Sequence, residues 1–333
     1  MNIHMDLKEN SYDIIVERGI LENAGLHLNL DRRVLVVTDT GVPESYAITL
    51  AKQCKASVIC TVESGESSKS MENFEKLLKT MLDNGFSRND CVVAVGGGVV
   101  GDLSGFVASA YMRGVDFYNI PTTLLSQIDS SIGGKTAINF GGIKNIVGAF
   151  YQPKKVLVDP ELLKTLPKRQ ISNGLAEAIK MALTSDSELF DVFENQVIED
   201  NIDEIIIRSL NIKKSVVEQD EKESGIRKIL NFGHTIGHGI ESSNTDLYHG
   251  ECVALGLIPM CGEEIRPRVV EVLKKCNLYN LVNFDWDKIS QAAFHDKKAD
   301  GNLVSVTMVN EIGKYEIKTL DFGQVSELFE RMV

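Results

Sequence analysis

Three histidines in the second half of the chain are the residues whose type and spacing first suggest chemistry. His234 and His238 lie four residues apart in NFGHTIGHGIESSNTDLYHGE, so they share one face of a predicted helix. His249 follows a polar break at residues 242–244 that ends this helix. Three imidazoles brought together, with a carboxylate from elsewhere, suit a borderline divalent metal such as zinc. The alternative is that the histidines pack or are solvated separately, because the HxxxH spacing alone is a weak signal.

A carboxylate that could join these histidines lies in GLAEAIK, where Glu177 interrupts an otherwise apolar helical stretch. A buried carboxylate costs free energy unless it is paired or bound to a metal. Lys180 is three residues further along the same face, so an exposed ion pair between the two is the alternative. In a predicted helix over 227–241, Arg227 and Asn231 precede His234 on its side of the helix, unless they are only part of a charged face.

A glycine run is the second feature that suggests a binding site. GGGVVGD, at 96–102, directly follows a predicted buried strand at 91–95 and opens a helix. Consecutive glycines let a diphosphate approach the backbone, and the helix N-terminus favours its negative charge. The run is not the G-x-G-x-x-G fingerprint, and a tight turn needed only for packing is the alternative.

The glycine-rich segment 133–150 is poor helix material and predicts a β-hairpin or a structured loop that lines a cleft. It carries Lys135, Lys144 and Asn145, which on a plain surface loop would simply be solvated. Apolar residues in and beside the segment predict instead that it is held against the protein: Ile132, Ile143, Ile146, Val147 and Phe150.

The elements that must position these residues change character along the chain. Apolar strands at 33–39, 57–62 and 91–95 alternate with helices at 43–55 and 70–85, which predicts an open parallel sheet. Beyond 161 the pattern is helical, apart from two short strands at 305–309 and 315–317. We therefore expect two domains: an α/β domain over 1–158 with a Rossmann-like sheet, and a mostly α-helical domain over 159–333. Helices are expected at 161–166, 171–183, 187–196, 202–223, 227–241, 251–263, 267–276 and 323–332.

Composition limits the classes of partner. The net charge of −12 argues against nucleic acid but permits a small anionic substrate where lysines and arginines gather. Six cysteines without a CxxC pair indicate reduced thiols. Because neither a secretory leader nor a membrane-length apolar run is seen, we expect a cytoplasmic protein with no membrane partner.

Taken together, the motifs resemble those of the 3-dehydroquinate synthase family, part of the wider group of sugar-phosphate cyclases. GGGVVGD, PTTLLSQIDSSIGGK, GIKNIVGAFYQP, TLPKRQISNGLAEAIK, DEKESGIRKILNFGHTIGH and HGE occur in the family's order, and the likeness runs from about Ser11 to Gly313. It implies a dehydroquinate synthase-like fold and, more distantly, a likeness to glycerol dehydrogenase and iron-dependent alcohol dehydrogenases. The segment after Glu251 is shorter than the family pattern.

The resemblance implies roles for individual residues. Glu177, His234 and His249 would hold the metal, zinc or else cobalt, while His238 would handle protons. Arg113 would reach the phosphate site of a neighbouring subunit in a homodimer, and Lys297 or Lys298 would serve the phosphate. Substrate and catalytic positions would be Asp129, Lys135, Asn145, Lys180, Lys213, Arg227 and Asn231. NAD would be held by Asp39, Glu66, Lys69, Gly97, Gly98, Asp102, Thr122, Thr123, Lys135, Lys144, Thr165, Leu166 and Gln170.

The implied reaction converts 3-deoxy-D-arabino-heptulosonate 7-phosphate to 3-dehydroquinate and phosphate, in the shikimate pathway to chorismate and the aromatic amino acids. It proceeds by transient oxidation with NAD, β-elimination of phosphate, re-reduction and intramolecular aldol closure, which makes the enzyme a phosphate-eliminating carbon–oxygen lyase. Two alternatives remain at this stage. One is another cyclase such as 2-deoxy-scyllo-inosose synthase, and the other is an NAD- and metal-dependent polyol dehydrogenase, which would have no phosphate to bind.

Overall fold

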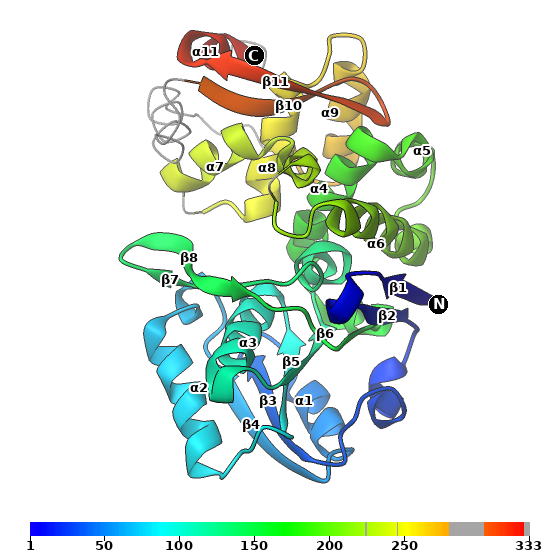
Figure 1. Ribbon diagram of the computed structural model, residues 1–333. Coiled ribbons are helices and arrows are strands. Elements are labelled where there is room, and N and C mark those ends of the chain that lie inside the picture. The colour runs from blue at the N-terminus through cyan, green and yellow to red at the C-terminus, as the bar shows by residue number, and fades with distance from the viewer. Residues whose placement is uncertain (224, 245, 280–302, 330–333) are drawn as a thin grey trace. The chain divides into compact units, whose positions relative to one another are not determined.

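The computed structural model describes residues 1–223, 225–244, 246–279 and 303–329 (Figure 1). The chain divides into two compact units, Met1–Leu166 and Pro167–Val333. This division falls after a short 3-10 helix, η6 (Pro160–Thr165), rather than after residue 158. The carboxylate of Asp159 explains the difference, since it accepts hydrogen bonds from the backbone N–H groups of Gly19 at 2.9 Å and Leu21 at 3.2 Å. These bonds hold η6 to the first unit.

The first unit is built on a seven-stranded sheet in the order β1-β2-β9-β6-β5-β3-β4. Only β1 and β2 pair antiparallel, and every other pair is parallel. Chain order reverses between β3 and β5, so their carboxyl ends flank the point where open sheets of this kind bind ligands. The predicted open parallel sheet is confirmed. Its strands are β1 (Asn2–Met5), β2 (Tyr12–Val16), β3 (Arg33–Asp39), β4 (Ala56–Val62), β5 (Cys91–Gly96), β6 (Asp116–Pro121) and β9 (Lys155–Val158).

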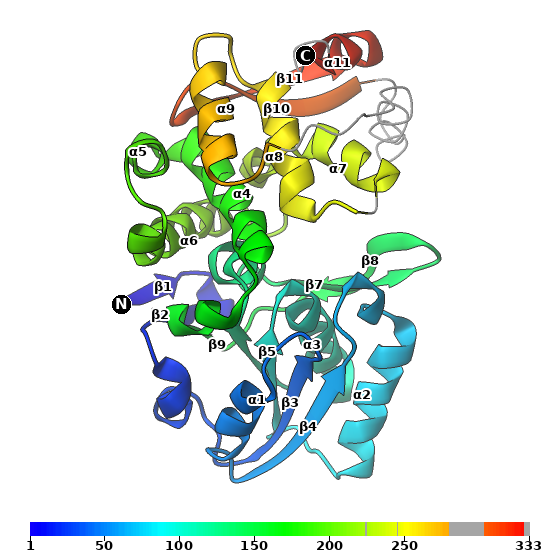
Figure 2. The same cartoon turned by 180° about the vertical axis from the view of Figure 1, so that it is seen from behind.

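Helices cover both faces of this sheet because its central strands are apolar on both sides. Val34 and Val36 of β3 belong to a core formed with helices α1 (Glu44–Ala51) and η2 (Ile20–Leu26). Leu35 and Val37 point to the other core, formed with α2 (Met71–Asp83) and α3 (Gly98–Ala110) (Figures 1 and 2). Short helical turns complete the unit: η1 (Lys8–Asn10), η3 (Glu66–Ser68), η4 (Tyr111–Arg113) and η5 (Ser126–Ser130).

Strands β1 and β2 are not among the predicted elements. Their burial alternates along each strand, in agreement with a period-2 pattern that is too short and too polar to stand out in the sequence. The predicted start of α2 is confirmed, since the Ser70 side chain accepts a hydrogen bond from the backbone N–H of Asn73 at 3.2 Å.

Segment 133–150 forms the predicted hairpin, from β7 (Lys135–Phe140) and β8 (Ile143–Phe150). The residues expected to hold it down do so only in part. Ile132 is buried, but Ile143, Ile146 and Phe150 are 55%, 57% and 47% exposed. The prediction that apolar side chains hold this segment is therefore confirmed only for Ile132 and Val147, which packs against the core that contains Ile138. Most of β8 lies in solvent, and polar bonds add to the anchoring.

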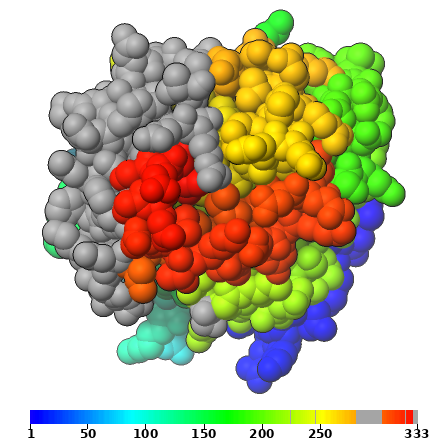
Figure 3. Space-filling model, turned by 90° about the horizontal axis from the view of Figure 1, so that it is seen from above, coloured from blue at the N-terminus to red at the C-terminus, as the bar shows by residue number. Residues whose placement is uncertain are grey.

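The second unit is mostly helical, as predicted. Its two-stranded sheet consists of β10 (Leu303–Glu311) and β11 (Lys314–Asp321), and α11 (Phe322–Phe329) follows β11. Figure 3 shows these red and orange-red elements on one face, next to the yellow and orange segments. Helix α4 packs on α8, and α8 packs on α7 (Figures 1 and 2). The other helices are α4 (Lys168–Ser185), α5 (Ser187–Asn195), η7 (Glu199–Asn201), α6 (Ile202–Gln219), η8 (Ile226–Asn231), α7 (His234–Ser243), α8 (His249–Met260) and α9 (Arg266–Lys275).

The predicted continuous helix over 227–241 is wrong. The chain forms η8, breaks, and starts α7 at His234, so Arg227 and Asn231 are not on the helix of that histidine. The break occurs at Gly233, whose φ of 77° lies in the left-handed region. A Cβ there would come within 2.7 Å of the Leu257 side chain, so the position requires glycine for two reasons.

Candidate metal centre

Three side chains from three helices of the second unit meet at one point. Glu177 is in α4, His234 is the first residue of α7, and His249 is the first residue of α8. The Oε1 atom of Glu177 lies 3.6 Å from His234 Nε2 and 3.5 Å from His249 Nε2. One possible ligand atom from each lies within 4.8 Å of the others. We call these three residues the Glu177 cluster.

The donor set of this cluster fits a divalent metal. Glu177 is 1% exposed, and its Oε1 atom is buried without a hydrogen-bond partner among the described residues. A buried unpartnered oxygen is costly, and a cation between it and two imidazole nitrogens would satisfy it. The other carboxylate oxygen, Oε2, accepts a hydrogen bond from Lys180. The site therefore has one oxygen and two nitrogens directed at a common point.

Neighbouring charges keep the Glu177 carboxylate ionised, and charge and burial together shift the pKa values of the two histidines in opposite directions. Burial would raise the pKa of Glu177, but Lys180 and the two imidazoles outweigh it and hold that pKa well below its usual range. Burial, with the charge of Lys180, lowers the pKa of His234 to about 3. Burial also acts to lower the pKa of His249, yet the Glu177 and Glu241 carboxylates raise it to about 9. An anionic oxygen and a neutral His234 are the forms that bind metal.

Close helix contact brings these residues together. A Cβ on Gly250 would lie 2.0 Å from the backbone oxygen of Asn173, so α8 and α4 can approach only with glycine there. Gly256 permits the same closeness between α8 and the start of α7, since its Cβ would lie 2.1 Å from the Gly233 oxygen. Glycine thus sets the spacing of the helices that carry the ligands.

An ion pair fixes the first turn of α8. Glu251 is buried, and Arg169 bonds it through two nitrogens, Nε to Oε1 at 2.8 Å and Nη2 to Oε2 at 2.7 Å. The Arg169 guanidinium also lies 4.2 Å from the ring centre of Tyr248. The backbone N–H of Tyr248 donates to Glu251 Oε2 at 2.7 Å. These contacts hold the residue that precedes His249 and the residue two after it.

His238 stands beside the cluster but outside it. It is exposed, with its ring centre 5.2 Å from that of His234 and 5.9 Å from that of His249. It falls instead into a second group, with Glu241 and His249. Glu241 is not among the residues predicted from the sequence, although it lies seven residues after His234 and so on the same face of α7.

Three predicted substrate residues are buried cations on elements that pack together. Lys180, Lys213 and Arg227 are 2%, 6% and 2% exposed, on α4, α6 and η8. Buried cations need counter-charges or acceptors, and Arg227 donates to the backbone oxygen of Glu221. Asn231 differs from these three, because it is exposed and donates to Glu223 Oε1 at 3.0 Å.

In the first unit, predicted NAD residues gather at the carboxyl ends of β3, β5 and β6. Asp39 ends β3, and its carboxylate accepts from the Gly41 N–H at 2.8 Å. The Thr122 N–H donates to the oxygen of Gly96 at 3.0 Å. The remaining members of this group are Gly97, Gly98 and Thr123, and a Cβ on Gly97 would lie 3.0 Å from Thr123. Packing thus favours a small residue at Gly97, which is compatible both with a diphosphate site and with a tight turn.

A second set of predicted residues forms what we call the Lys69 network. Lys69 is 4% exposed; its Nζ bonds Asp102 Oδ2 at 2.7 Å and also donates to Asn145 Oδ1. Asn139 of β7 joins through its N–H to the Lys69 oxygen at 2.8 Å and through Nδ2 to Glu66 Oε1 at 3.0 Å. These bonds, rather than Ile143, Ile146 and Phe150, tie the hairpin to the sheet end.

The other predicted residues are not among those that define the Glu177 cluster or the Lys69 network. Asp129 is half-buried in η5, a π-helical turn of a kind often found at functional sites. Arg113 is exposed with a φ of 71°, and Lys135 and Lys144 are exposed on the hairpin. Thr165 and Leu166 end the first unit, whereas Gln170 is in α4 of the second. Lys297, Lys298 and His295 lie outside the described residues.

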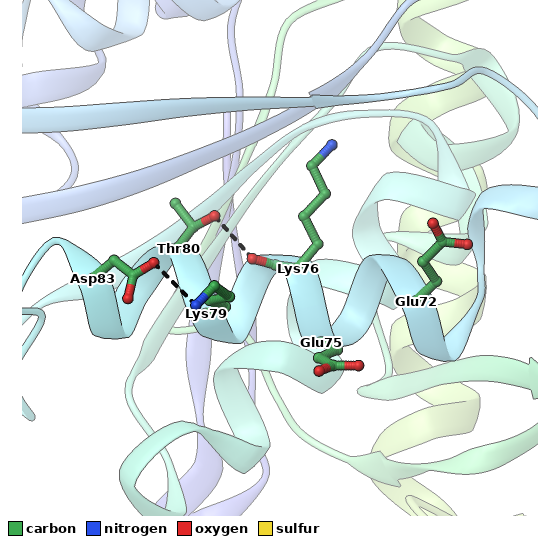
Figure 4. Close-up of a pocket in the computed structure, with 6 residues that line it drawn as sticks. All are labelled: Glu72, Glu75, Lys76, Lys79, Thr80 and Asp83. Carbon is green, nitrogen blue, oxygen red and sulfur yellow. Dashed lines mark hydrogen bonds and ion pairs between the residues drawn. The ribbon is translucent and has the colours of Figure 1, made fainter.

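A groove along the outer face of α2 carries no comparable chemistry. Its lining comes from one helix, where the Lys79 and Asp83 side chains pair at 3.6 Å and Thr80 donates to the Lys76 oxygen at 2.8 Å (Figure 4). Charged side chains at this spacing are typical of a solvated helix face. In the parts of the chain that the structure describes, none of the helices combines the length and apolar character that a membrane span requires.

Comparison with solved structures defines the class of fold. The chain superimposes with a TM-score of 0.90 on 2-deoxy-scyllo-inosose synthase complexed with carbaglucose-6-phosphate, NAD+ and Co2+, at 24% identity over 98% of this chain and 99% of that one. It superimposes with a TM-score of 0.88 on 2-epi-5-epi-valiolone synthase from Streptomyces hygroscopicus with NAD+ and Zn2+ bound, at 28% identity over 98% of both. The fold is dehydroquinate synthase-like, as predicted.

Sequence comparison gives the family. Residues 59–173 match the model of the 3-dehydroquinate synthase N-terminal region, and 174–299 match that of the C-terminal region. The chain is 39% identical to the 3-dehydroquinate synthase of Streptococcus thermophilus over 355 positions, covering 99% of this chain and all of the relative. The chain belongs to the 3-dehydroquinate synthase family. This chain has 333 residues and the alignment spans 355 positions, so the relative carries residues that this chain lacks. In this chain, residues 261–265 alone join α8 to α9.

Proposed function

We propose that this chain is a 3-dehydroquinate synthase that converts 3-deoxy-D-arabino-heptulosonate 7-phosphate to 3-dehydroquinate and phosphate. The observation that carries the proposal is the Glu177 cluster, with an unpartnered buried oxygen facing two imidazole nitrogens, in a chain 39% identical to such an enzyme over its whole length. Phosphate elimination without net redox change makes the enzyme a carbon–oxygen lyase.

Glu177, His234 and His249 would hold the divalent metal. One carboxylate and two imidazoles suit zinc, with cobalt as the alternative, and structural neighbours carry Zn2+ or Co2+. The metal would supply a Lewis acid that lowers the pKa of a substrate hydroxyl. Lys180 keeps Glu177 ionised and oriented through its bond to Oε2, so the opposite oxygen stays available.

NAD would bind at the sheet end of the first unit, where it would supply a hydride acceptor that is regenerated in each cycle. The point between β3 and β5 where the chain order reverses supports this location. The parallel strands bring Asp39, the glycine run and Thr122 together at their carboxyl ends. The residues proposed to contact it are Asp39, Glu66, Lys69, Gly97, Gly98, Asp102, Thr122, Thr123, Lys135, Lys144, Thr165, Leu166 and Gln170.

The chain's own groups would bind the two anionic ends of the substrate and move its protons. His238 is exposed beside the two ligand histidines but outside the ligand set, and it would suit proton transfer with a substrate hydroxyl held at the metal. The cations Lys213 and Arg227 would neutralise carboxylate or phosphate, and the amide of Asn231 would donate a hydrogen bond to it. Asp129, Lys135, Asn145 and Arg113 complete the proposed set, with Arg113 acting across a homodimer. We propose a cytoplasmic enzyme with no nucleic-acid or membrane partner.

The test supplies three substrates to the protein with zinc and substoichiometric NAD. Heptulosonate 7-phosphate is expected to release phosphate and form 3-dehydroquinate in many turnovers per NAD, without accumulation of NADH. Turnover of glucose 6-phosphate instead would identify a 2-deoxy-scyllo-inosose synthase. Net NADH formation from glycerol, with no phosphate release from either sugar phosphate, would identify a polyol dehydrogenase. Either of these last two results contradicts the proposal.

A further inference from the structure

Both ring nitrogens of His249 face a carboxylate. Nε2 lies 3.5 Å from Glu177 Oε1, and Nδ1 lies 3.1 Å from Glu241 Oε2. A ring nitrogen that binds a metal offers its lone pair, so the other nitrogen carries the hydrogen. With Nδ1 as the donor, Glu241 accepts that hydrogen and His249 presents Nε2 to the cluster.

His234 has the same arrangement with a different acceptor. Its Nδ1 lies 3.1 Å from the backbone oxygen of Phe232, and its Nε2 lies 3.6 Å from the same Glu177 oxygen. Both histidines therefore direct the same nitrogen at one point. The acceptor for His234 is supplied by the chain two residues away, whereas the acceptor for His249 must come from another helix.

Glu241 is placed to supply it. It lies two turns after His234 on α7, and it links the end of that helix to the first residue of α8. Its side chain is 20% exposed, so water competes only weakly for the carboxylate. A hydrogen bond to an ionised acceptor is also stronger and more directional than one to a neutral group.

We propose that Glu241 is a positioning residue that fixes the ring orientation and hydrogen position of His249 and so strengthens metal binding. The inference rests on the metal centre of the proposed function and is independent of which substrate is used. A rival use of the same atoms is a second cation held by His238, Glu241 and His249, whose ligand atoms also lie within 4.8 Å of one another. The two uses exclude each other, because an Nδ1 that donates to Glu241 cannot bind a cation.

The first experiment measures zinc affinity by competition with a chromophoric chelator, and the visible spectrum of the Co2+ form. Glu241→Gln is expected to weaken zinc binding by about 10–100-fold and to change the Co2+ spectrum, with one ion per chain as in the wild type. The matched control is Glu218→Gln. Glu218 has a side-chain exposure of 22% and bonds Lys214 at 2.8 Å on α6, a helix that carries none of the three ligands, so both readouts should stay unchanged.

The second experiment repeats Glu241→Gln in a His249→Ala background. Since Glu241 acts through His249, the substitution should then change the residual zinc affinity less than about twofold. An equal loss in both backgrounds would overturn the proposal in favour of a general charge effect. Unchanged affinity and spectrum in the single variant would overturn it, as would two ions per wild-type chain with one lost in Glu241→Gln. A protein that shows the expected zinc results but releases no phosphate would support the inference and contradict the proposed function.

Discussion

The Glu177 cluster and the Lys69 network show two ways of assembling a site. The cluster draws Glu177, His234 and His249 from three helices. Glycines let these helices approach closely, and the buried Glu251 carboxylate fixes the start of α8. The network draws its members from loops at the end of one sheet, and one lysine bonds a hairpin whose outer strand is exposed. We conclude that the metal centre is preformed by packing. The hairpin is held by Ile138, Val147 and a few polar bonds, so its exposed strand should open at lower cost.

Removing a metal ligand should have the largest effect. His234→Ala is expected to abolish stoichiometric zinc binding, leaving at most a weak two-ligand affinity measurable in excess zinc, and to reduce phosphate release to background. His238→Ala should keep the zinc and lose rate, by about 100-fold or more if it transfers protons. Loss of zinc in the His238 variant, measured by metal analysis after gel filtration, would show that the two roles are wrongly divided.

Crowding the contact between α8 and α4 should come next. Gly250→Ala places a Cβ 2.0 Å from a backbone oxygen, so we expect a loss of about 3 kcal/mol in the free energy of unfolding, with weaker zinc binding. Gly25→Ala is the matched control in the first unit, since its Cβ would meet its nearest neighbour at an ordinary 3.6 Å. Denaturant unfolding of both variants measures the difference, and equal stability would mean that the helices are not held by this contact.

Cutting the Lys69 network should affect the first unit alone. Lys69→Met removes charged hydrogen bonds to Asp102 and Asn145, at a cost of about 1.5–3 kcal/mol. Amide hydrogen exchange in β7 and β8 should speed up, NAD affinity should fall, and zinc affinity should be unchanged. Unaltered exchange in the hairpin would show that contacts other than Lys69 hold it.

A smaller, pH-dependent effect is expected away from both sites. Asp186 accepts from the Leu189 N–H at 3.0 Å and from Arg208 Nη2 at 2.8 Å, and although burial acts to raise its pKa, these bonds lower it below the ordinary 3.8. A carboxyl with a depressed folded pKa stabilises the protein above its unfolded pKa and loses that contribution as pH falls through the folded value. Asp186→Asn should therefore cost about 1–2 kcal/mol at pH 7 and progressively less below pH 3.8. A constant cost down to pH 2 would contradict this.

The sequence predicted the parts of the fold that have a local signal. Strand β3 has an apolar run over residues 34–37 and lies at its predicted bounds, and Ser70 marks the start of α2. The break at Gly233 was missed because a glycine inside a helical pattern usually costs only about 1 kcal/mol, and its need here comes from Leu257 on another helix. The bond from Lys69 to the hairpin was likewise not predicted, because Lys69 is distant from Asn145 in sequence.

The metal ligands could be named in advance only through the family resemblance, because spacing alone put His234 and His238 together. The structure shows why spacing misleads. His234 and His238 share one face of α7, but α4 brings Glu177 to His234, and His238 stays exposed. Glu241 carried a signal, seven residues after His234, but its meaning depends on where α8 begins. Contacts between helices far apart in the chain decide each of these cases.

Zinc titration of phosphate release by metal-depleted protein tests the assignment of the metal centre most directly. With heptulosonate 7-phosphate and catalytic NAD, we predict no release without metal, then a linear rise that ends at one zinc per chain, with no net NADH. In His234→Ala the same titration should stay flat. Release at full rate from metal-free protein, or restoration of that variant by zinc, would contradict the assignment of Glu177, His234 and His249 as the metal centre.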